Sequence, residues 1–427
     1  MSAEAGVGGL VAADPQRAKL VRSAWVMVGM SMLGTMACST SVVLVNTGVF
    51  MKPLSGALGW GRGEIAVALS IAAISMALFN PLAGWLIDRF GVRPVLIASL
   101  LGYAVATAAV PLLINAIGIW GLYIGYAAIA AIGAGSNVIA YVRVLSGWFS
   151  GPLDGWRGLA LGISSAGVPL GSTVSGPLGV VLIQRFGWQG GYFGLALMPI
   201  LLGLPIAIFA IRMASHEVAA SHAALPSAPR EGLSMTEAMA TRAFWLMMVI
   251  VLLMSSCLQG IGIHTAPLLS DRGLASDDLA VVLGFVGVLG IVGRVGAGFL
   301  FDRFFAPRVA IGIFGIGAVA AFVLVGVPGV VVAILAVMLV TVGSGAESDF
   351  VGYLVGRYFG LRAYGQIFGV IYGMFMVGIA IGPALFGFLF DRFHDYQIPF
   401  ALAGAGLTLL CGLLLFLPRY ALEKAAA

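Results

Sequence analysis

The sequence is poor in the residues from which most catalytic and metal sites are built. Charged residues make up 9% of its 427 residues, and it contains 4 histidines and 3 cysteines. The cysteines, Cys38, Cys257 and Cys411, lie far apart in the sequence, which favours neither a disulfide framework nor a metal cluster. The sequence shows no nucleophile motif, phosphate-binding loop or metal-ligand spacing. We therefore expect no catalytic residues, no cofactor and no metal site.

Apolar residues and glycine, by contrast, are abundant. Hydrophobic residues account for 61% of the chain, and 61 residues are glycine. This composition is too apolar for a soluble domain and predicts a protein with many membrane spans. The apolar runs are about 20 residues or longer without strict alternation, so helices are favoured over a barrel. Hydropathy predicts an all-α membrane protein with twelve spans at residues 24–50, 64–87, 94–114, 118–148, 158–183, 190–212, 243–270, 276–301, 308–326, 329–356, 363–390 and 397–417.

The basic residues are unevenly distributed around these spans. Of the 22 lysines and arginines, sixteen flank the side of the N-terminus, five flank the other side, and Arg294 falls within a span. By the positive-inside rule both termini are cytoplasmic, and we interpret the membrane as a bacterial inner membrane. Arg17, Lys19 and Arg22 precede a first span too long for a signal peptide, which predicts a tail at 1–23. The basic charge orients the chain in the lipid bilayer and does not indicate nucleic acid.

The longest polar stretch, residues 213–242, leaves six predicted spans on each side. Near its end, Ser234 is followed three residues later by Glu237, a spacing that predicts a capped, short amphipathic helix. We interpret the stretch as a cytoplasmic linker between two halves. The predicted domains are a cytoplasmic tail, a six-helix bundle, this linker, a second six-helix bundle and a second cytoplasmic tail, at residues 1–23, 24–212, 213–242, 243–417 and 418–427.

A short phrase ending in Asp-Arg-Phe marks an internal repeat. It occurs at Leu86–Phe90, Leu300–Phe304 and Leu389–Phe393, and a degenerate copy occupies Ile183–Phe186. Within each half, consecutive copies are separated by an odd number of predicted spans, so they must face opposite sides of the membrane. The sequence therefore predicts two pseudo-symmetric six-helix bundles built from inverted three-helix repeats, which is an architecture of secondary transporters.

The loop after the second predicted span resembles the signature of a known family. Residues Gly84–Arg93 resemble the pattern G-x-x-x-D-R-x-G-x-R of the major facilitator superfamily over its whole length, and Gly298–Arg303 is a weaker second copy. Acidic and basic residues in such a loop can pair across a moving interface, and glycine permits close helix approach. The resemblance implies the major facilitator fold, and it implies a gating role for Gly84, Asp88, Arg89, Gly91, Arg93, Asp302 and Arg303.

A narrower resemblance is carried by segments in both halves, namely Leu58–Ile65, Trp148–Phe149, Arg157–Gly162, Thr241–Trp245 and Arg357–Arg362. These segments resemble the monocarboxylate and oxalate/formate transporter branch of that superfamily. In animal monocarboxylate transporters an arginine of the eighth span helps to bind the carboxylate, and Arg294 stands at the matching position. The chain departs from the animal pattern at Val45, where that branch has a lysine, and at Gly290, where it has an aspartate. The resemblance thus implies a carboxylate substrate.

Three charged residues, Arg294, Glu347 and Asp349, are predicted to lie deep in the membrane. A charge at mid-bilayer costs roughly 2.5–3.5 kcal/mol on insertion scales, so such residues are paired or face a cavity. At about 1.5 Å per residue, all three lie about 12–15 Å along their helices from Asp302 or Arg357. The cation and both acids therefore share one depth.

The two halves differ at these positions. Asn80 stands in the place of Arg294, and Asn137 stands in the place of Glu347. We expect Arg294 to bind a substrate carboxylate while a proton neutralises Glu347 or Asp349. The alternative is a buried structural pair that replaces an amide contact. Which acid faces the arginine stays open, because residues two apart on a helix point about 200° apart.

Three further polar residues, Asn46, Asn137 and Tyr372, are candidates for the substrate cavity, with hydrogen bonding or packing between helices as the alternative. The features together favour secondary active transport of a small organic anion, similar to a monocarboxylate, with proton symport by alternating access. Anion exchange of the oxalate/formate type, export of amphipathic drugs and a transport-derived membrane sensor are the alternatives. The substrate, direction, stoichiometry and oligomeric state stay open.

Overall fold

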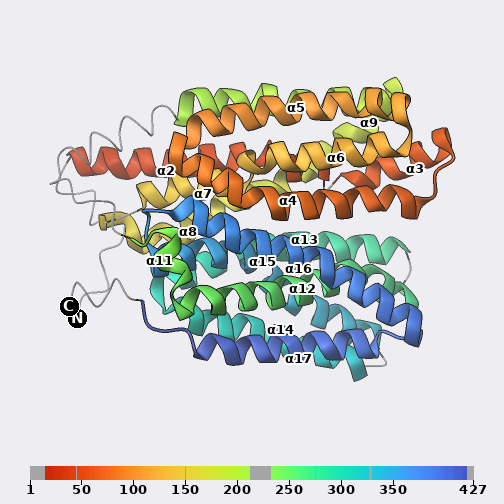
Figure 1. The fold of residues 1–427 in the computed structure, drawn as a ribbon. Coiled ribbons are helices and arrows are strands. Elements are labelled where there is room, and N and C mark those ends of the chain that lie inside the picture. The colour runs from red at the N-terminus through yellow and green to blue at the C-terminus, as the bar shows by residue number, and fades with distance from the viewer. Residues whose placement is uncertain are drawn as a thin grey trace.

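The computed structural model describes residues 15–44, 46–149, 151–211, 232–274, 276–326 and 329–420 (Figure 1). This part of the chain is helical, with one isolated antiparallel bridge between Gly232 and Gly360. Ten of its segments are long and apolar enough to cross a membrane. The all-α membrane architecture agrees with the composition, because in lipid a helix satisfies its own backbone groups.

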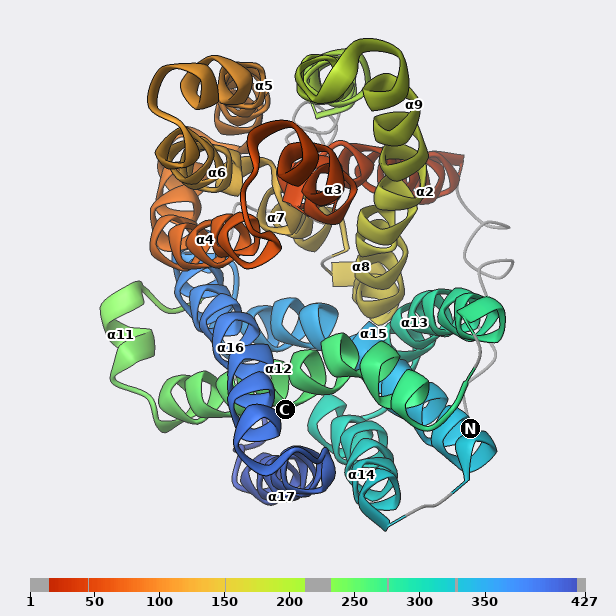
Figure 2. The same ribbon diagram turned by 90° about the vertical axis from the view of Figure 1, so that its right-hand side faces the viewer.

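The elements of the first half gather on one side of the molecule (Figures 1 and 2). Its long helices are α2 (Pro15–Met36), α4 (Arg62–Phe90), α5 (Val92–Ile117) and α9 (Gly167–Leu195). Its shorter helices are α3 (Thr47–Leu58), α6 (Ile119–Gly133), α7 (Val138–Trp148) and α8 (Arg157–Ser165). Single turns of other geometry are η1 (Thr40–Leu44), η2 (Ala134–Ser136), η3 (Gly151–Trp156), η4 (Pro199–Gly203) and η5 (Ile206–Ala210).

The elements of the second half lie on the other side. They begin with the short helix α11, which covers one end of the molecule (Figure 1). The long helices follow, and each is a near-continuous apolar run. The bounds are α11 (Met235–Met239), α12 (Arg242–Asp271), α13 (Ser276–Arg303), α14 (Ala306–Gly326), α15 (Val330–Phe359), α16 (Tyr364–Phe393) and α17 (Gln397–Leu415).

The expectation of one helix over residues 24–50 is wrong. The first helix, α2, begins before residue 24 and ends at Met36. A break then separates α2 from η1 and α3. Hydroxyls at the interruption bond to backbone of the same half: Thr35 Oγ1 donates to Ser164 O at 2.6 Å, and Ser41 Oγ donates to Val168 O at 3.0 Å. Both contacts join residues that are far apart in the sequence, so a local hydropathy window misses the break.

The expected division between the spans 158–183 and 190–212 is present, but the first of these spans is broken once more. Both fall in one continuous apolar stretch, Leu153–Ala210, which is longer than one membrane crossing. The chain turns between them at Gly187, whose φ of 73° is strained for residues with a side chain. A second break, which hydropathy does not predict, separates α8 from α9 after Ser165. Hydropathy therefore locates the turn between the spans but not the break within the first of them.

The two halves meet along two pairs of helices, α4 with α16 and α8 with α13. Figure 2 shows both pairs between the halves. The turn between α4 and α5 lies at Gly91, whose φ of 86° favours glycine. We call the end of the molecule that holds Gly91 and Asp302 the motif end, and α11 lies at this end (Figure 1).

The start of α11 is joined to the loop between α15 and α16. Leu233 N donates to Phe359 O at 2.8 Å, next to the bridge from Gly232. Ser234 caps the helix, accepting from Glu237 N at 3.3 Å, and Glu237 accepts from Ser234 N at 2.7 Å. This hydrogen bond from Ser234 lowers the pKa of Glu237. Most of the predicted linker, position 45 and parts of both predicted tails lie outside the described residues.

Candidate functional site

The three predicted charges come together between α13 and α15. Arg294 Nε lies 3.7 Å from Asp349 Oδ2, and the Asp349 side chain is 1% exposed. Arg294 Nε also donates to Gly345 O at 3.1 Å. Across the interface, Arg294 Nη1 donates to Ser165 O of α8 at 2.8 Å. One guanidinium thus contacts a buried carboxylate of its own half and the backbone of the other half.

Glycines bring α13 and α15 close enough for this pairing. A Cβ on Gly345 would meet the carbonyl oxygen of Gly290, and a Cβ on Gly293 would meet that of Val342. Small residues at a helix interface let the backbones approach closely, as is common in membrane proteins. The glycine where the animal monocarboxylate transporters have an aspartate, Gly290, therefore lies at this close contact.

Glu347 points to a different partner from Asp349. Gln259 of α12 donates through Nε2 to Glu347 Oε1 at 2.5 Å. The second oxygen, Glu347 Oε2, is buried and has no hydrogen-bond partner among the described residues. In the structure, Asp349 is therefore the ion-pair partner of Arg294, and Glu347 is held by an amide. Both acids are buried, at 4% exposure for Glu347 and 2% for Asp349.

Tyr372 lies on α16, which packs against α12 and α15. Its side chain is buried, and the residue is 7% exposed. Its ring stacks on Phe375 with a centroid distance of 5.1 Å.

The amides that the sequence places in the cavity lie in the first half. Asn46 Nδ2 donates to Ser41 O at 3.1 Å and to Ser175 Oγ at 2.5 Å, so it is held by its own bundle. Asn137 Oδ1 accepts from Thr40 Oγ1 at 3.2 Å, while its Nδ2 is buried without a hydrogen bond among the described residues. The substrate contact assigned to both asparagines stays a prediction.

The two motif aspartates at the motif end each bind the start of a helix in the opposite half. Asp88 Oδ2 accepts from Gln366 N, in the first turn of α16, at 2.8 Å. Asp302 accepts from Gly158 N at 2.6 Å and from Leu159 N at 2.8 Å, in the first turn of α8. Helix N-termini carry unpaired N–H groups and partial positive charge, which a carboxylate stabilises.

Glycines allow these contacts by bringing backbones together. A Cβ on Gly84 would meet the carbonyl oxygen of Gly365, and a Cβ on Gly298 would meet that of Gly158. Gly84 precedes Asp88 by the same four residues by which Gly298 precedes Asp302. The repeated motif thus forms the same contact twice, once from each half.

The other predicted gating residues have weaker contacts. Arg89 lies 5.0 Å from the ring centroid of Trp85 in its own helix. Arg93 Nε is buried without a hydrogen bond among the described residues. Arg303 lies 3.7 Å from the ring centroid of Phe299 and 5.7 Å from that of Trp156 in the other half. Their role in gating stays a prediction.

The sequence interpretation missed several cross-half contacts at the motif end. Arg143 Nη2 donates to Leu361 O at 3.2 Å, and Arg357 Nη1 lies 2.6 Å from Asp154 Oδ2. The guanidinium of Arg157 occupies the space that a Cβ on residue 356 would need. From the sequence, these arginines count among the charges that orient the chain, and Arg157 and Arg357 also belong to segments that carry the family resemblance. Their place at loops in both halves is the signal that would have suggested a gate.

Comparison with known proteins decides the family. The sequence matches the profile of the Major Facilitator Superfamily over residues 24–350. The chain belongs to the Major Facilitator Superfamily. It is therefore an integral, multi-pass membrane protein that transports small molecules and is not an enzyme. The resemblance stated from Gly84–Arg93 is confirmed, and so is the major facilitator fold.

Individual relatives of this superfamily member are distant. A hexuronate transporter of Bacillus subtilis (strain 168) is 23% identical over 392 residues, covering 82% of this chain and 84% of that protein. Monocarboxylate transporter 3 of Rattus norvegicus is 32% identical over 144 residues, covering 34% of this chain and 28% of that protein. Among solved structures, the E. coli fucose:proton symporter FucP has a TM-score of 0.67 at 14% identity, covering 94% of this chain and 99% of that chain. This structural likeness concerns the fold.

Proposed function

We propose that this transporter moves small organic anions by secondary active transport and couples a carboxylate to a proton. The observation that carries the proposal is the position of Arg294, which pairs with Asp349 and donates to Ser165 O of the opposite half. Guanidinium groups bind carboxylates with two parallel, charge-assisted hydrogen bonds. A carboxylate bound here would act on both halves at once.

Binding of a carboxylate at Arg294 changes the state of Asp349. The incoming anion competes with Asp349, whose nearer oxygen is 3.7 Å from the guanidinium. A buried carboxylate that loses its cation is costly unless it takes up a proton. Substrate binding therefore favours protonation at this site. Glu347 is the second proton acceptor, because one of its oxygens has no hydrogen-bond partner among the described residues.

Coupling to one proton also removes an electrical cost. A monoanion that crosses alone moves one charge through the membrane potential, at about 2.3 kcal/mol per 100 mV. A monoanion with one proton moves no net charge. Arg294 is surrounded by two buried acids, Glu347 and Asp349, which suits the binding of an anion together with a proton.

The motif end supplies the gate for alternating access in this proposal. The helix-capping contacts of Asp88 and Asp302 join the halves there, and they must break before substrate leaves toward that side. The excess of lysine and arginine supports a cytoplasmic location for this end and for both termini. We infer that the membrane is a bacterial inner membrane.

Two classes of carboxylate are candidate substrates. The monocarboxylate transporters are the relatives at 32% identity, and the hexuronate transporter is the relative that covers 82% of the chain. Both names denote carboxylates, for which Arg294 is a suitable partner. Monocarboxylates are our first choice, and uronic acids are the second.

The test is uptake by the purified protein in proteoliposomes. Labelled monocarboxylates and uronates are offered with and without an inward proton gradient. We expect the gradient to drive accumulation of at least one carboxylate and of no matched alcohol. An exchange signal that is indifferent to the gradient would contradict proton symport and favour an anion exchanger.

Replacing both acids, Glu347→Gln together with Asp349→Asn, is expected to uncouple transport from the proton gradient. With one proton per substrate, a gradient of one pH unit drives about tenfold accumulation in the parent protein. Neither amide can take up a proton, so accumulation in the double variant falls to about the equilibrium ratio while exchange continues. Glu237→Gln, at the exposed glutamate on α11, is the control and keeps the parent ratio. Parent-like accumulation in the double variant would contradict the assignment of the proton site.

A further inference from the structure

The helix α16 carries a ladder of aromatic rings that runs from the motif end toward the charged cluster. Tyr364, Phe368, Tyr372 and Phe375 are stacked in sequence, with neighbouring centroids 5.8, 5.1 and 5.1 Å apart and interplanar angles of 7°, 16° and 18°. Their spacing puts all four on one face of the helix. This face is apolar except for its tyrosine hydroxyls.

The far part of the ladder lies at the depth of Arg294. Gly369 of α16 packs on the carbonyl of Asn80, just as Gly162 of α8 packs on the carbonyl of Arg294. Because Asn80 and Arg294 are equivalent in the repeat, Gly369 and Arg294 lie at one level. Tyr372 follows Gly369 by three residues, so it lies about 4.5 Å along the helix from this level. The rings therefore flank the place where the carboxylate would bind.

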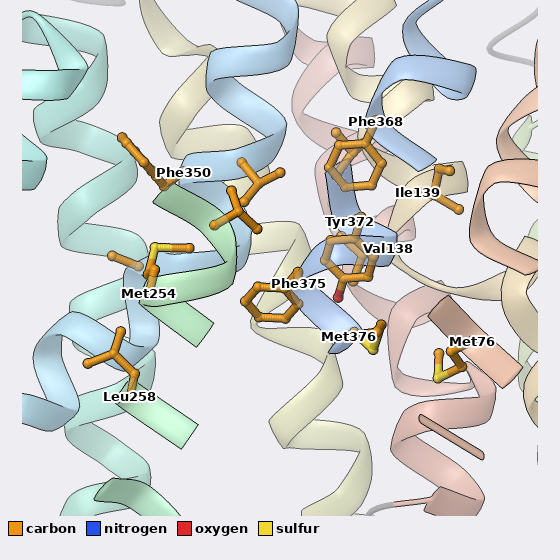
Figure 3. Close-up of a cluster of buried hydrophobic side chains, with 14 of the residues drawn as sticks. Met76, Val138, Ile139, Met254, Leu258, Phe350, Phe368, Tyr372, Phe375 and Met376 are labelled. Carbon is orange, nitrogen blue, oxygen red and sulfur yellow. The ribbon is translucent and has the colours of Figure 1, made fainter. Parts of the chain in front are cut away.

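Apolar side chains of the first half lie beside Tyr372 and Phe375, and we call the combined apolar surface the wall. Figure 3 shows Tyr372 and Phe375 in one cluster with Met376 of the same helix and with Met76 and Val138 of the other half. The cluster is buried, with exposures of 7% for Tyr372, 6% for Met376 and 6% for Val138. Methionine is flexible and polarisable, so it adapts to ligands of different shape.

Hydrogen-bonding groups are few along the wall. The Asn137 amide nitrogen is buried without a hydrogen-bond partner among the described residues. The Asn137 oxygen is already bonded to Ser39 and Thr40. A uronic acid would bring several hydroxyls to this wall, and each one buried without a partner weakens binding by about tenfold. An apolar group is stabilised by the same burial.

We propose that the substrate is a monocarboxylate with an apolar body, aromatic or branched, whose carboxylate binds Arg294 and whose body lies against Tyr372 and Phe375. This inference rests on the proposed function and narrows its substrate class. Aromatic rings stack on such a body in offset or edge-to-face geometry. The aromatic rings therefore select the apolar part of the substrate, and Arg294 selects its carboxylate.

The test compares carboxylates that differ in their bodies, using the full chain in proteoliposomes. Each buried methylene tightens binding by about fourfold, so we expect the KM of phenylacetate to lie at least about tenfold below that of acetate. We expect 3-methylbutanoate to fall between them and glucuronate to have a KM at least about tenfold above that of phenylacetate. The alcohol 2-phenylethanol, which lacks the carboxylate, should not compete.

Phe375→Ala then tests the wall directly. It should raise the KM of phenylacetate about tenfold and change that of acetate by less than about twofold. Phe375→Leu, which keeps most of the side-chain volume, should raise the KM of phenylacetate to an intermediate value. It is a control for a folding defect caused by the smaller alanine. Phe388→Ala is the matched control on the same helix, because Phe388 is 68% exposed, and it should change neither KM.

The outcomes separate this inference from the proposed function. If acetate or glucuronate is preferred to phenylacetate, while Arg294→Ala still abolishes uptake, the apolar substrate class is wrong and carboxylate transport stands. If uptake of every carboxylate is indifferent to Arg294→Ala, both are wrong. If Phe375→Ala leaves the phenylacetate to acetate ratio unchanged, the wall does not select the substrate.

Discussion

Arg294→Ala is expected to lower kcat/KM for carboxylate uptake by about 30-fold or more. Losing one partner of a buried, hydrogen-bonded charge pair costs about 2–5 kcal/mol, and each 1.4 kcal/mol is about a factor of ten. The substitution also removes the bond from the guanidinium to Ser165 O across the two halves. Initial uptake rates in proteoliposomes, measured beside the thermal unfolding of the purified variant, give the effect.

The control for this prediction separates binding from stability. Arg294→Ala leaves Asp349 without its cation, so the single variant is destabilised. The double variant with Asp349→Asn should recover thermal stability but not transport. Arg392→Ala, at an exposed arginine near the end of α16, should transport like the parent protein. A stable Arg294→Ala protein with parent uptake would make the arginine purely structural.

Gly298→Ala is expected to remove most transport by preventing closure of the motif end. Its new Cβ would meet the carbonyl oxygen of Gly158, a backbone atom that has no rotamer by which to move away. Overpacking of this kind costs about 1–3 kcal/mol, which shifts the ratio of closed to open states by about 5- to 150-fold. We expect slow uptake and faster labelling of a buried thiol introduced by Ser146→Cys at that end.

The same helix provides the control for the glycine. A Cβ on Gly296 would meet no atom within 4 Å, so Gly296→Ala should transport and label like the parent protein. Gly158→Ala, which strikes the same contact from the other half, should reproduce the defect. Equal uptake by Gly298→Ala and Gly296→Ala would contradict the requirement for backbone contact at the motif end.

The repeated motif predicts that Asp88 and Asp302 occupy equivalent positions, but it does not predict which groups they contact. The Asp-Arg-Phe phrase predicted equivalent places for Asp88 and Asp302, and each aspartate does contact the first turn of a helix in the opposite half. A basic partner is present for Asp88, which lies 3.4 Å from Arg143 Nε of its own half, but the partners in the opposite half are backbone N–H groups. Backbone N–H groups at a helix start leave no mark in the sequence, since any residue supplies them.

The breaks in the first and fifth predicted spans show a second limit of prediction from the sequence. Hydropathy averages over a window, so it locates an apolar run but not an interruption such as that before η1. The interruption is stabilised by hydroxyl contacts such as that of Thr35 to Ser164 O. These contacts join segments far apart in the chain, and a local window does not include them.

The sequence by itself determined that this is a helical membrane transporter with a repeated motif and three charges at one depth. Hydropathy, motif spacing and the rise per residue are local properties, and they are enough for these conclusions. Only the tertiary structure decided that Asp349 pairs with Arg294, that Glu347 turns to Gln259, and that the guanidinium reaches the opposite half. These contacts depend on how each helix is rotated and packed against distant segments.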